Sequence, residues 1–249
     1  MNNLSYERKK KITIIAIVTI IAVLGILLAI VLATNSGGEV PASVAEDNIT
    51  HQSTVPDGYT GIYNINDLTS ISSDSSNLTK NYILMADISL LGIDFEPIGN
   101  NTTPFKGIFD GNNYTISDLN INSSNQYVGL FGYVNGGTIK NLILENATVK
   151  STYTNSSSGY SGYIGGVAGA VTTNGSIENL HITGNSNISN EIPEGKTASN
   201  QIYIGGVTGY SYNNAKIENA STNANVTATS TMGIIKAGGL VGSNYGIIN

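Results

Sequence analysis

A short glycine-rich unit recurs four times in the second half of this chain, and it limits the possible folds more than any other feature. The last glycines of successive copies stand 37, 40 and 33 residues apart. A second element with the pattern Ile-x-Asn follows each copy, and Ser, Thr, Asn and Gly fill the connections. Neither element has helical periodicity, so both are predicted to be short strands. The glycine units are Val128–Gly132, Gly165–Gly169, Gly205–Gly209 and Gly238–Gly242, and the second elements begin at Gly137, Gly175, Ala215 and Gly246.

A unit of this size built from short strands cannot enclose a core alone, so neighbouring copies are expected to stack and share one. Apolar side chains alternate along three short stretches of the first copy, which predicts one three-sided coil per copy. The chain is therefore predicted to be all-β, with its coils stacked as a solenoid. The inward positions expected from the alternation are Val128, Leu130, Leu142, Leu144, Ala147 and Val149, and Phe131 falls on the alternate set.

Glycine and asparagine are both expected to have structural roles in this solenoid. The repeated glycines are expected to permit sharp corners and positive φ. Stacked Asn side chains can hydrogen-bond to one another along the solenoid, although separate surface roles stay open because Asn tolerates turns. The glycines are Gly129, Gly132, Gly166, Gly169, Gly206 and Gly209; the predicted ladder is Asn141, Asn179, Asn219 and Asn249, with Asp118 at the same place in a degenerate earlier copy.

These repeats resemble the GLUG-motif repeat proteins. The resemblance rests on Gly238-Gly-Leu-Val-Gly242 and its three relatives, on the Ile-x-Asn-Leu elements, and on the stretch from Pro97 to Leu119, and it covers about residues 60–249. Members of that family look like right-handed parallel β-helices on microbial surfaces. They are found in adhesin-like proteins and beside the protease region of some IgA-cleaving peptidases. The resemblance implies a right-handed parallel β-helix and an exported location, and it implies no particular activity.

An apolar block near the N-terminus also predicts export. Residues 12–33 carry only two Thr and one Gly among apolar side chains, and as a helix they would extend about 33 Å, enough to cross a membrane core of ~30 Å. Basic residues at 8–11 precede the block and none lies in 35–56, which places the C-terminal part outside the cell. A cleaved secretory signal is the alternative, because Val31-Leu32-Ala33 resembles a cleavage site, although the block is longer than a usual signal core.

The chain is thus predicted to consist of five segments. They are a cytoplasmic basic tail (1–11), a transmembrane anchor or signal segment (12–33), a flexible tether (34–58), the first coils of the solenoid (59–124) and the GLUG-type repeat coils (125–249). The last copy stops within its second element at Asn249, so an incomplete end with exposed strand edges is expected. A truncated product, a coil completed by a partner and end-to-end packing stay open as explanations.

Composition excludes several classes of partner. The chain has 17 Asp plus Glu and 11 Lys plus Arg, and beyond residue 35 it has seven lysines and no arginine. This acidic balance argues against a nucleic-acid partner. Without Cys, disulfides and thiolate metal sites are excluded. None of the glycine units continues into the Lys-Ser/Thr of a phosphate loop, and no cofactor is expected.

Catalytic and metal-binding patterns are scarce. Asp94 and Glu96 stand two residues apart, and a glycoside hydrolase needs two carboxylates, but acids at this spacing on an exposed strand face are ordinarily solvated. Asp110–Asn113 lacks the spaced acidic ligands of a calcium loop and is predicted to be a tight turn. His181 is expected to point outward and His51 to lie in the tether. Neither has a partner at ligand spacing, so no metal site is predicted.

Tyrosine is the most promising binding feature, with 14 residues in the chain. Its ring stacks on sugar faces and anchors interfaces, although Tyr also simply suits strands. We therefore predict a non-catalytic, membrane-anchored cell-surface module that binds a glycan or a host or neighbouring surface protein. A carbohydrate-active β-helix enzyme and a spacer fragment of a larger surface protein stay open. The candidate ligand-facing tyrosines are Tyr153, Tyr160, Tyr163, Tyr203, Tyr210 and Tyr212.

Overall fold

The computed structural model describes residues 51–154, 161–192, 194, 201–230 and 233–249. The predicted basic tail, the apolar block 12–33 and most of the predicted tether lie outside these residues, as does Tyr160. In the described ranges, no helix has the length and apolar character needed to cross a membrane. The membrane anchor therefore stays a prediction from the sequence.

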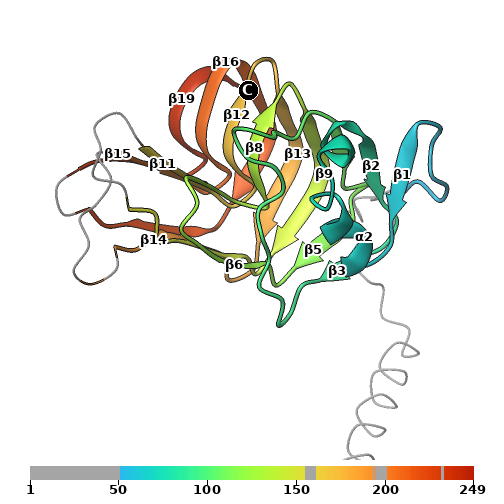
Figure 1. Cartoon of the computed structure of the whole chain (residues 1–249), viewed down its shortest axis with the longest axis horizontal. Coiled ribbons are helices and arrows are strands. Elements are labelled where there is room, and N and C mark those ends of the chain that lie inside the picture. Colours follow the sequence, from blue (N-terminus) through green and yellow to red (C-terminus); the bar gives the residue numbers. More distant parts are fainter. Residues whose placement is uncertain (1–50, 155–160, 193, 195–200, 231–232) are drawn as a thin grey trace, which may run out of the picture. The chain divides into compact units, whose positions relative to one another are not determined.

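Strands dominate the described chain and form three sheets in which the strand pairs are parallel, so the all-β prediction is confirmed. Figure 1 shows that the sheets curl. The first sheet contains β1 (Tyr59–Ile62), β2 (Asn81–Leu84), β3 (Ile88–Ser89), β4 (Ile108–Asp110), β5 (Thr115–Ser117), β8 (Phe131–Asn135), β9 (Thr138–Glu145), β12 (Ala168–Thr172), β13 (Ser176–Thr183), β16 (Thr208–Thr222) and β19 (Val241–Ile248). The second contains β6 (Asn120–Ser123), β10 (Thr148–Ser151), β14 (Asn187–Asn190) and β17 (Asn225–Ala228), and the third contains β7 (Tyr127–Val128), β11 (Ser161–Gly165), β15 (Gln201–Gly205) and β18 (Ile234–Gly238).

Each repeat strand pairs with the equivalent strand of the next copy. Ile139 pairs with Ile177, and Ile177 pairs in turn with Ile217. In Figure 1, β8, β12, β16 and β19 accordingly lie side by side in this order. The sequence repeat is therefore also the pairing repeat, and equivalent residues of successive copies become neighbours across the sheet.

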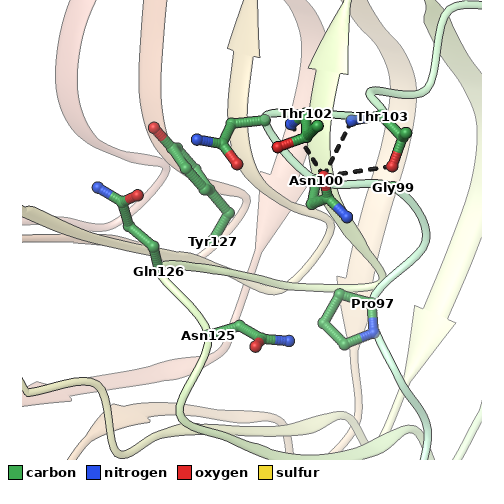
Figure 2. Close-up of a pocket in the computed structure, with 9 residues that line it drawn as sticks. Pro97, Gly99, Asn100, Thr102, Thr103, Asn125, Gln126 and Tyr127 are labelled. Atoms are coloured by element: carbon green, nitrogen blue, oxygen red, sulfur yellow. Dashed lines mark hydrogen bonds between the residues drawn. The ribbon is translucent and has the colours of Figure 1, made fainter.

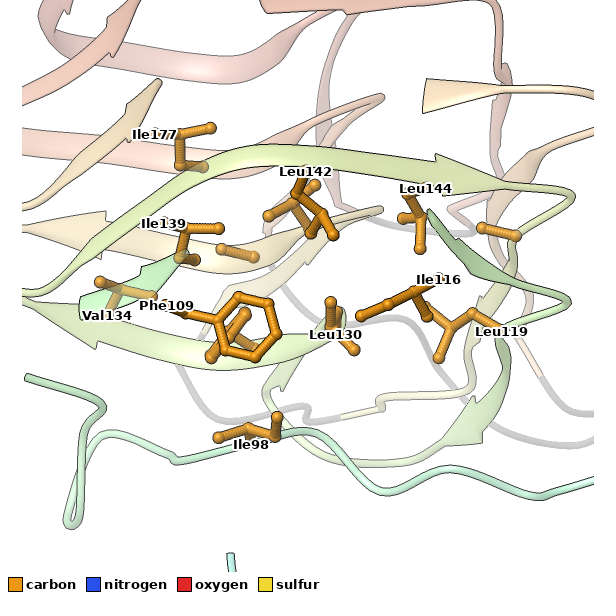
Figure 3. Packing of buried hydrophobic residues seen from close by; sticks show 14 of the residues in the cluster. Ile98, Phe109, Ile116, Leu119, Leu130, Val134, Ile139, Leu142, Leu144 and Ile177 are labelled. Atoms are coloured by element: carbon orange, nitrogen blue, oxygen red, sulfur yellow. The ribbon is translucent and has the colours of Figure 1, made fainter. Parts of the chain in front are cut away.

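The core is formed by side chains that alternate inward along these strands. Leu142 and Leu144 are fully buried, whereas Glu145 is exposed, and Figure 3 shows both leucines packed in one apolar cluster with Leu130. Phe131 departs from the expected alternation because it is fully buried. The chain bends at residues 129–130 between β7 and β8, and this bend restarts the alternation.

The degenerate early copy pairs in a different register from the one that its sequence suggests. Phe109 pairs with Ile139, and Ile116 pairs with Leu144. Residues 111–114 between β4 and β5 stand opposite only two residues of β9. The early copy therefore contains an insertion here, which shifts the register of the residues that follow. Asp118, whose amide donates to the Glu145 carbonyl over 2.9 Å, therefore lies outside the ladder position predicted for it.

Two short helical segments precede the repeats. Helix α2 (Ile65–Ser70) begins at Asn64, whose side chain accepts a hydrogen bond from the Asp67 amide, and it buries Leu68. The 3-10 helix η1 (Ser75–Thr79) is capped in the same way by Asp74. These caps satisfy amides that a helix start leaves without partners.

The repeated glycines allow close backbone approach and have no positive φ, so that expectation is wrong. A Cβ on Gly169 would lie 2.7 Å from the Gly132 carbonyl oxygen, and one on Gly209 would lie 2.9 Å from the Gly169 oxygen. Positive φ is found instead at Asn141, Asn179 and Asn219, with values of 52°, 48° and 47°. Glycine therefore sets the spacing between copies, and asparagine makes the left-handed turn within them.

The last strands expose apolar side chains. Ile234 and Ile235 on β18 and Ile247 and Ile248 on β19 are all exposed. In the sheet order of the described residues, β17 and β18 are end strands. The outer edges of these strands are therefore unpaired within the described chain.

Candidate functional site

Three stacked tyrosines cross the third sheet and form what we call the tyrosine column. Tyr127, Tyr163 and Tyr203 share one register position on β7, β11 and β15. The ring centroids of Tyr127 and Tyr163 are 4.8 Å apart with planes inclined by 5°, and those of Tyr163 and Tyr203 are 5.1 Å apart with planes inclined by 4°. Parallel strands lie about 4.8 Å apart, so identical residues in register bring their rings to stacking distance.

The two ends of the tyrosine column differ. Lys236 on β18 continues the register beyond Tyr203, and its ammonium lies 5.0 Å from the Tyr203 ring centroid. A cation at this distance from a ring is attracted by the ring's negative face. At the opposite end, β7 is the end strand of the third sheet, so no described strand covers the side of Tyr127 that faces away from Tyr163.

Tyrosines of the first sheet extend this surface. Tyr210 lies 5.3 Å from Tyr163 and 5.7 Å from Tyr203, measured between ring centroids. Tyr212 and Tyr245 are register partners on β16 and β19, and they are 51% and 61% exposed. We call the tyrosine column together with Tyr210, Tyr212 and Tyr245 the aromatic surface.

The six tyrosines predicted from the sequence lie in different surroundings. Four of them, Tyr163, Tyr203, Tyr210 and Tyr212, come together in the aromatic surface. Tyr153 is buried, and so is Tyr203, whose ring is covered by Tyr163 and Lys236; each is 9% exposed. Tyr160 lies outside the described residues.

Sequence reasoning missed Tyr127, Tyr245 and Tyr133, the last of which meets Tyr127 edge to face at 4.8 Å. A signal for the column is present in the sequence. Tyr163, Tyr203 and Lys236 each stand six residues before the last glycine of their copy, whereas Tyr127 stands five residues before Gly132. Tyr127 nevertheless shares the register, because the offset between paired residues of the first two copies is 36 at β7 and 37 at β8.

The hydroxyls of three tyrosines are held neutral by their surroundings. Burial raises the pKa of Tyr127 and Tyr163 above the ordinary value, and it raises the pKa of Tyr210 to about 12. Neighbouring tyrosines add to each shift, because two phenolates at this distance would repel each other. At neutral pH, Tyr127, Tyr163 and Tyr210 therefore offer rings and uncharged hydroxyls.

A pocket of about 420 Å³ opens beside the Tyr127 end of the column. Asn100 shapes its rim, because its Oδ1 accepts hydrogen bonds from the amides of Thr102 and Thr103, each over 2.9 Å (Figure 2). None of the lining residues carries a charged side chain. We call it the Tyr127 pocket, and it is lined by Pro97, Gly99, Asn100, Asn101, Thr102, Thr103, Asn125, Gln126 and Tyr127.

The asparagines predicted to form a ladder are partly linked. Asn179 Nδ2 donates to Asn141 Oδ1 over 3.0 Å, and Asn219 Nδ2 donates to Asn179 Oδ1 over 2.7 Å. Asn141 Nδ2 donates to Asp110 Oδ1 over 3.0 Å, so an aspartate begins the series. Asn249 does not continue it, because its side chain donates to Glu218 Oε1. Asn249 is the terminal residue, and its backbone meets Ile217 and Asn219.

The acidic residues do not converge. Asp94 and Glu96 are both exposed, and Asp94 Oδ1 accepts a hydrogen bond from Asn120. Asp110 is buried and lies 3.3 Å from the Lys140 ammonium, so its charge is already paired. Among the residues that the structure describes, no group of three His, Asp or Glu side chains could hold a metal ion.

The two histidines lie in different surroundings. His181 is exposed, and its Nδ1 lies 2.8 Å from the Ser221 hydroxyl. His51 stacks on Tyr114 with ring centroids 4.1 Å apart, and its Nδ1 lies 2.8 Å from the Asn112 carbonyl oxygen. His51 therefore contacts the first coils, although it falls in the range that the sequence assigns to the tether.

Comparisons with known proteins identify the fold more clearly than the family. No family model matches the chain. Over 94 residues, 33% of the chain, it is 40% identical to Halomucin of Haloquadratum walsbyi, and the match covers 1% of that protein. The fold is similar to the crystal structure of a candidate immunoglobulin A1 protease from Bacteroides ovatus, with a TM-score of 0.51 and 21% identity.

The structural match covers 76% of this chain and 61% of the Bacteroides ovatus chain. At this identity the likeness shows a shared fold and nothing about activity. In both comparisons the chain spans less than two thirds of the relative. What either protein does as a whole is therefore not transferred from these matches.

Proposed function

We propose that this protein is a non-catalytic cell-surface module for adhesion or interaction, displayed on a right-handed parallel β-helix of GLUG-type repeats. The pairing of each strand with its equivalent in the next copy supports the β-helix. The aromatic surface is the observation that carries the binding role. Tyrosine is enriched at binding surfaces because its ring gives a large contact area at low entropic cost and its hydroxyl makes hydrogen bonds.

The proposed location is the outside of a cell membrane, with residues 12–33 as a single-pass anchor or as a cleaved signal. The basic residues at 8–11 support this orientation, since positive flanks stay in the cytoplasm. The proposed partner is a glycan or a host or neighbouring surface protein. A nucleic-acid partner is not proposed, because the formal net charge is −6.

We propose no catalytic step. A glycosidase needs two carboxylates about 5–10 Å apart across a substrate, one of them with a raised pKa. Asp94 and Glu96 are exposed, and Asp110 is paired with Lys140. The description of the Bacteroides ovatus protein concerns that protein, and peptidase activity is not part of this proposal.

The binding role is tested with the full chain on an array of glycans and purified surface proteins. The double variant Tyr212→Ala/Tyr245→Ala should lose most binding, because it removes the two exposed rings of the aromatic surface. Tyr63→Ala is the matched control, because Tyr63 is 55% exposed on the first coils, outside the aromatic surface. Equal binding by all variants would contradict the proposal, as would release of sugar or peptide fragments from any array member.

The location is tested by adding protease to intact cells that express the full chain with a tag at each end. The account predicts loss of the C-terminal tag and protection of the N-terminal tag in the anchored form. A cleaved signal would remove the N-terminal tag from the mature protein before protease is added. Protection of the C-terminal tag in intact cells, with digestion after lysis, would contradict the proposed location.

A further inference from the structure

The Tyr127 pocket joins a half-buried aromatic ring to a set of uncharged polar groups. Tyr127 presents one face to Tyr163, and on its other side the third sheet has no further strand. The loop 99–103 and residues 125–126 line the space there. The pocket volume of about 420 Å³ lies in the range of small-ligand sites, roughly 300–1,000 Å³.

The polar groups of the pocket have unused hydrogen-bonding capacity. Asn100 Oδ1 is committed to the loop, since it accepts from Thr102 and Thr103. By contrast, the side-chain amides of Asn101 and Asn125 make no hydrogen bond with the described part of the protein. Each free amide offers two donors and an acceptor. A ligand that both donates and accepts at several positions would match these groups.

The absence of charge in the lining narrows the ligand class. A phosphate, sulfate or carboxylate that left water for this pocket would meet no cation, and an unpaired charge is costly to desolvate. Lys236, the cation of the tyrosine column, stands at the Tyr203 end, beyond Tyr163 and Tyr203 in the same register. The Tyr127 end therefore favours a neutral ligand.

We propose that the Tyr127 pocket binds a neutral mono- or oligosaccharide. The apolar C–H face of a sugar ring would stack on Tyr127, and its hydroxyls, each both donor and acceptor, would meet Asn101 and Asn125. The remaining rings of the column contribute by holding Tyr127 in place, because their own faces are covered by one another and by Lys236. The proposal rests on the non-catalytic binding function above and gives it a site and a ligand class.

The test uses the full chain, produced in a host without N-glycosylation and purified in a detergent without a sugar headgroup. Production in such a host removes the ambiguity of the acceptor sequence Asn101-Thr-Thr103. The probes are an array of neutral oligosaccharides of glucose, galactose, mannose and N-acetylhexosamines, with sialylated and uronic acid oligosaccharides as the acidic set. Calorimetric titration then measures the dissociation constant for each neutral probe that binds.

The variants separate stacking from folding. Tyr127→Ala should weaken binding of the best neutral probe about tenfold, which is about 1.4 kcal/mol, because the sugar loses the ring on which it stacks. Asn101→Ala and Asn125→Ala should each weaken it severalfold without loss of fold, because neither side chain bonds to the described protein. Tyr127→Phe should regain the affinity that Tyr127→Ala loses, because it keeps the ring. Tyr63→Ala is the control and should bind as the unchanged protein does, because Tyr63 lies outside the pocket and outside the aromatic surface.

The proposal would be overturned if no neutral probe bound or if the protein preferred the acidic set. It would also be overturned if Asn101→Ala and Asn125→Ala both bound the neutral probe as tightly as the unchanged protein does. These failures differ from failure of the proposed function. A chain that binds a surface protein through Tyr212 and Tyr245 but no neutral sugar would keep the adhesion role and lose this site. Loss of every interaction on the arrays would remove both.

Discussion

At the residue scale, glycine and asparagine divide the backbone demands of each copy between them. Gly132, Gly169, Gly209 and Gly242 face one another across successive copies, at distances that no side chain would permit. The asparagines of β9, β13 and β16 adopt left-handed φ and bond to their counterparts. The abundance of the two residue types in the sequence thus has two distinct physical causes.

Gly169→Ala should destabilise the protein by about 1–3 kcal/mol, the usual cost of overpacking. Its Cβ would meet three backbone atoms, Gly132 O and Val128 N at 2.7 Å and Tyr163 O at 2.9 Å, and none of these belongs to a flexible side chain. Gly239→Ala is the control, because a Cβ there would meet nothing within 4 Å. Urea unfolding followed by circular dichroism measures both, and equal midpoints for the two variants would refute the close-packing role.

Asn179 allows the hydrogen-bonded series to be separated from backbone strain. Asn179→Ala removes two side-chain hydrogen bonds, and it leaves at φ 48° a residue that tolerates the left-handed region less well than Asn does. The combined loss should be about 1–2 kcal/mol. Asn179→Gly loses the same bonds but relieves the strain, so it should retain about 1 kcal/mol more than Asn179→Ala. If both variants match the unchanged protein in urea unfolding, the Asn series contributes nothing to stability.

At the element scale, the parallel register of the third sheet makes its tyrosine rings stack. A tyrosine is repeated at one register position on β7, β11 and β15, and the parallel pairing brings the rings face to face. The same burial that holds the rings together raises the pKa of their hydroxyls. The sheet should therefore respond to alkaline pH.

The stability of the protein should fall above pH 10. In the unfolded chain each phenol ionises near its ordinary value, whereas the folded pKa of Tyr127, Tyr163 and Tyr210 is raised. A raised folded pKa means that stability is fully present below pH 10 and is lost as pH rises toward 12 and beyond. Urea midpoints between pH 8 and 12 measure the fall, and Tyr163→Phe should make it shallower.

The spectroscopic counterpart is the ultraviolet absorbance of phenolate. In the folded protein, part of the absorbance change that accompanies tyrosine ionisation should appear only above pH 11. In urea-unfolded protein, the whole change should appear near pH 10. If every tyrosine of the folded chain ionises near pH 10, burial of the column is not what the account describes.

The limits of prediction from sequence also appear at this scale. The copy-to-copy pairing follows from the repeat, because identical strands with identical glycine spacing pair most readily with one another. The register of Phe109 and Ile116 did not follow, because residues 111–114 insert between two strands too short to show a pattern. Phe131 was placed on the wrong set because alternation was carried across a bend.

The candidate site was predictable only in part. Tyrosine was recognised as the binding residue, yet Tyr127 was missed, because it stands one residue closer to the last glycine of its copy than Tyr163 and Tyr203 do. The Tyr127 pocket could not be derived from sequence, since it forms where residues 97–103 meet residues 125–127. Such an encounter depends on the path of the chain between β3 and β7, which has no repeat to guide it.

At the scale of the whole molecule, every stated role depends on copies that pair in parallel and in register. The hydrophobic interior, the tyrosine column and the Asn series all consist of residues 36–40 positions apart in sequence. An antiparallel arrangement of the same strands would bring other residues together and would remove all three at once. The register is therefore the central claim.

Cysteine cross-linking tests it most directly, and the chain has no native Cys to interfere. Glu178 and Glu218 are register partners on β13 and β16, and Ser221 lies three positions beyond Glu218. Bridged residues need Cα atoms within about 7 Å, whereas three strand positions add roughly 10 Å. The full chain with Glu178→Cys and Glu218→Cys should form an intramolecular disulfide on mild oxidation, and the pair Glu178→Cys and Ser221→Cys should stay reduced. Equal oxidation of both pairs, or oxidation of the second alone, would contradict the account.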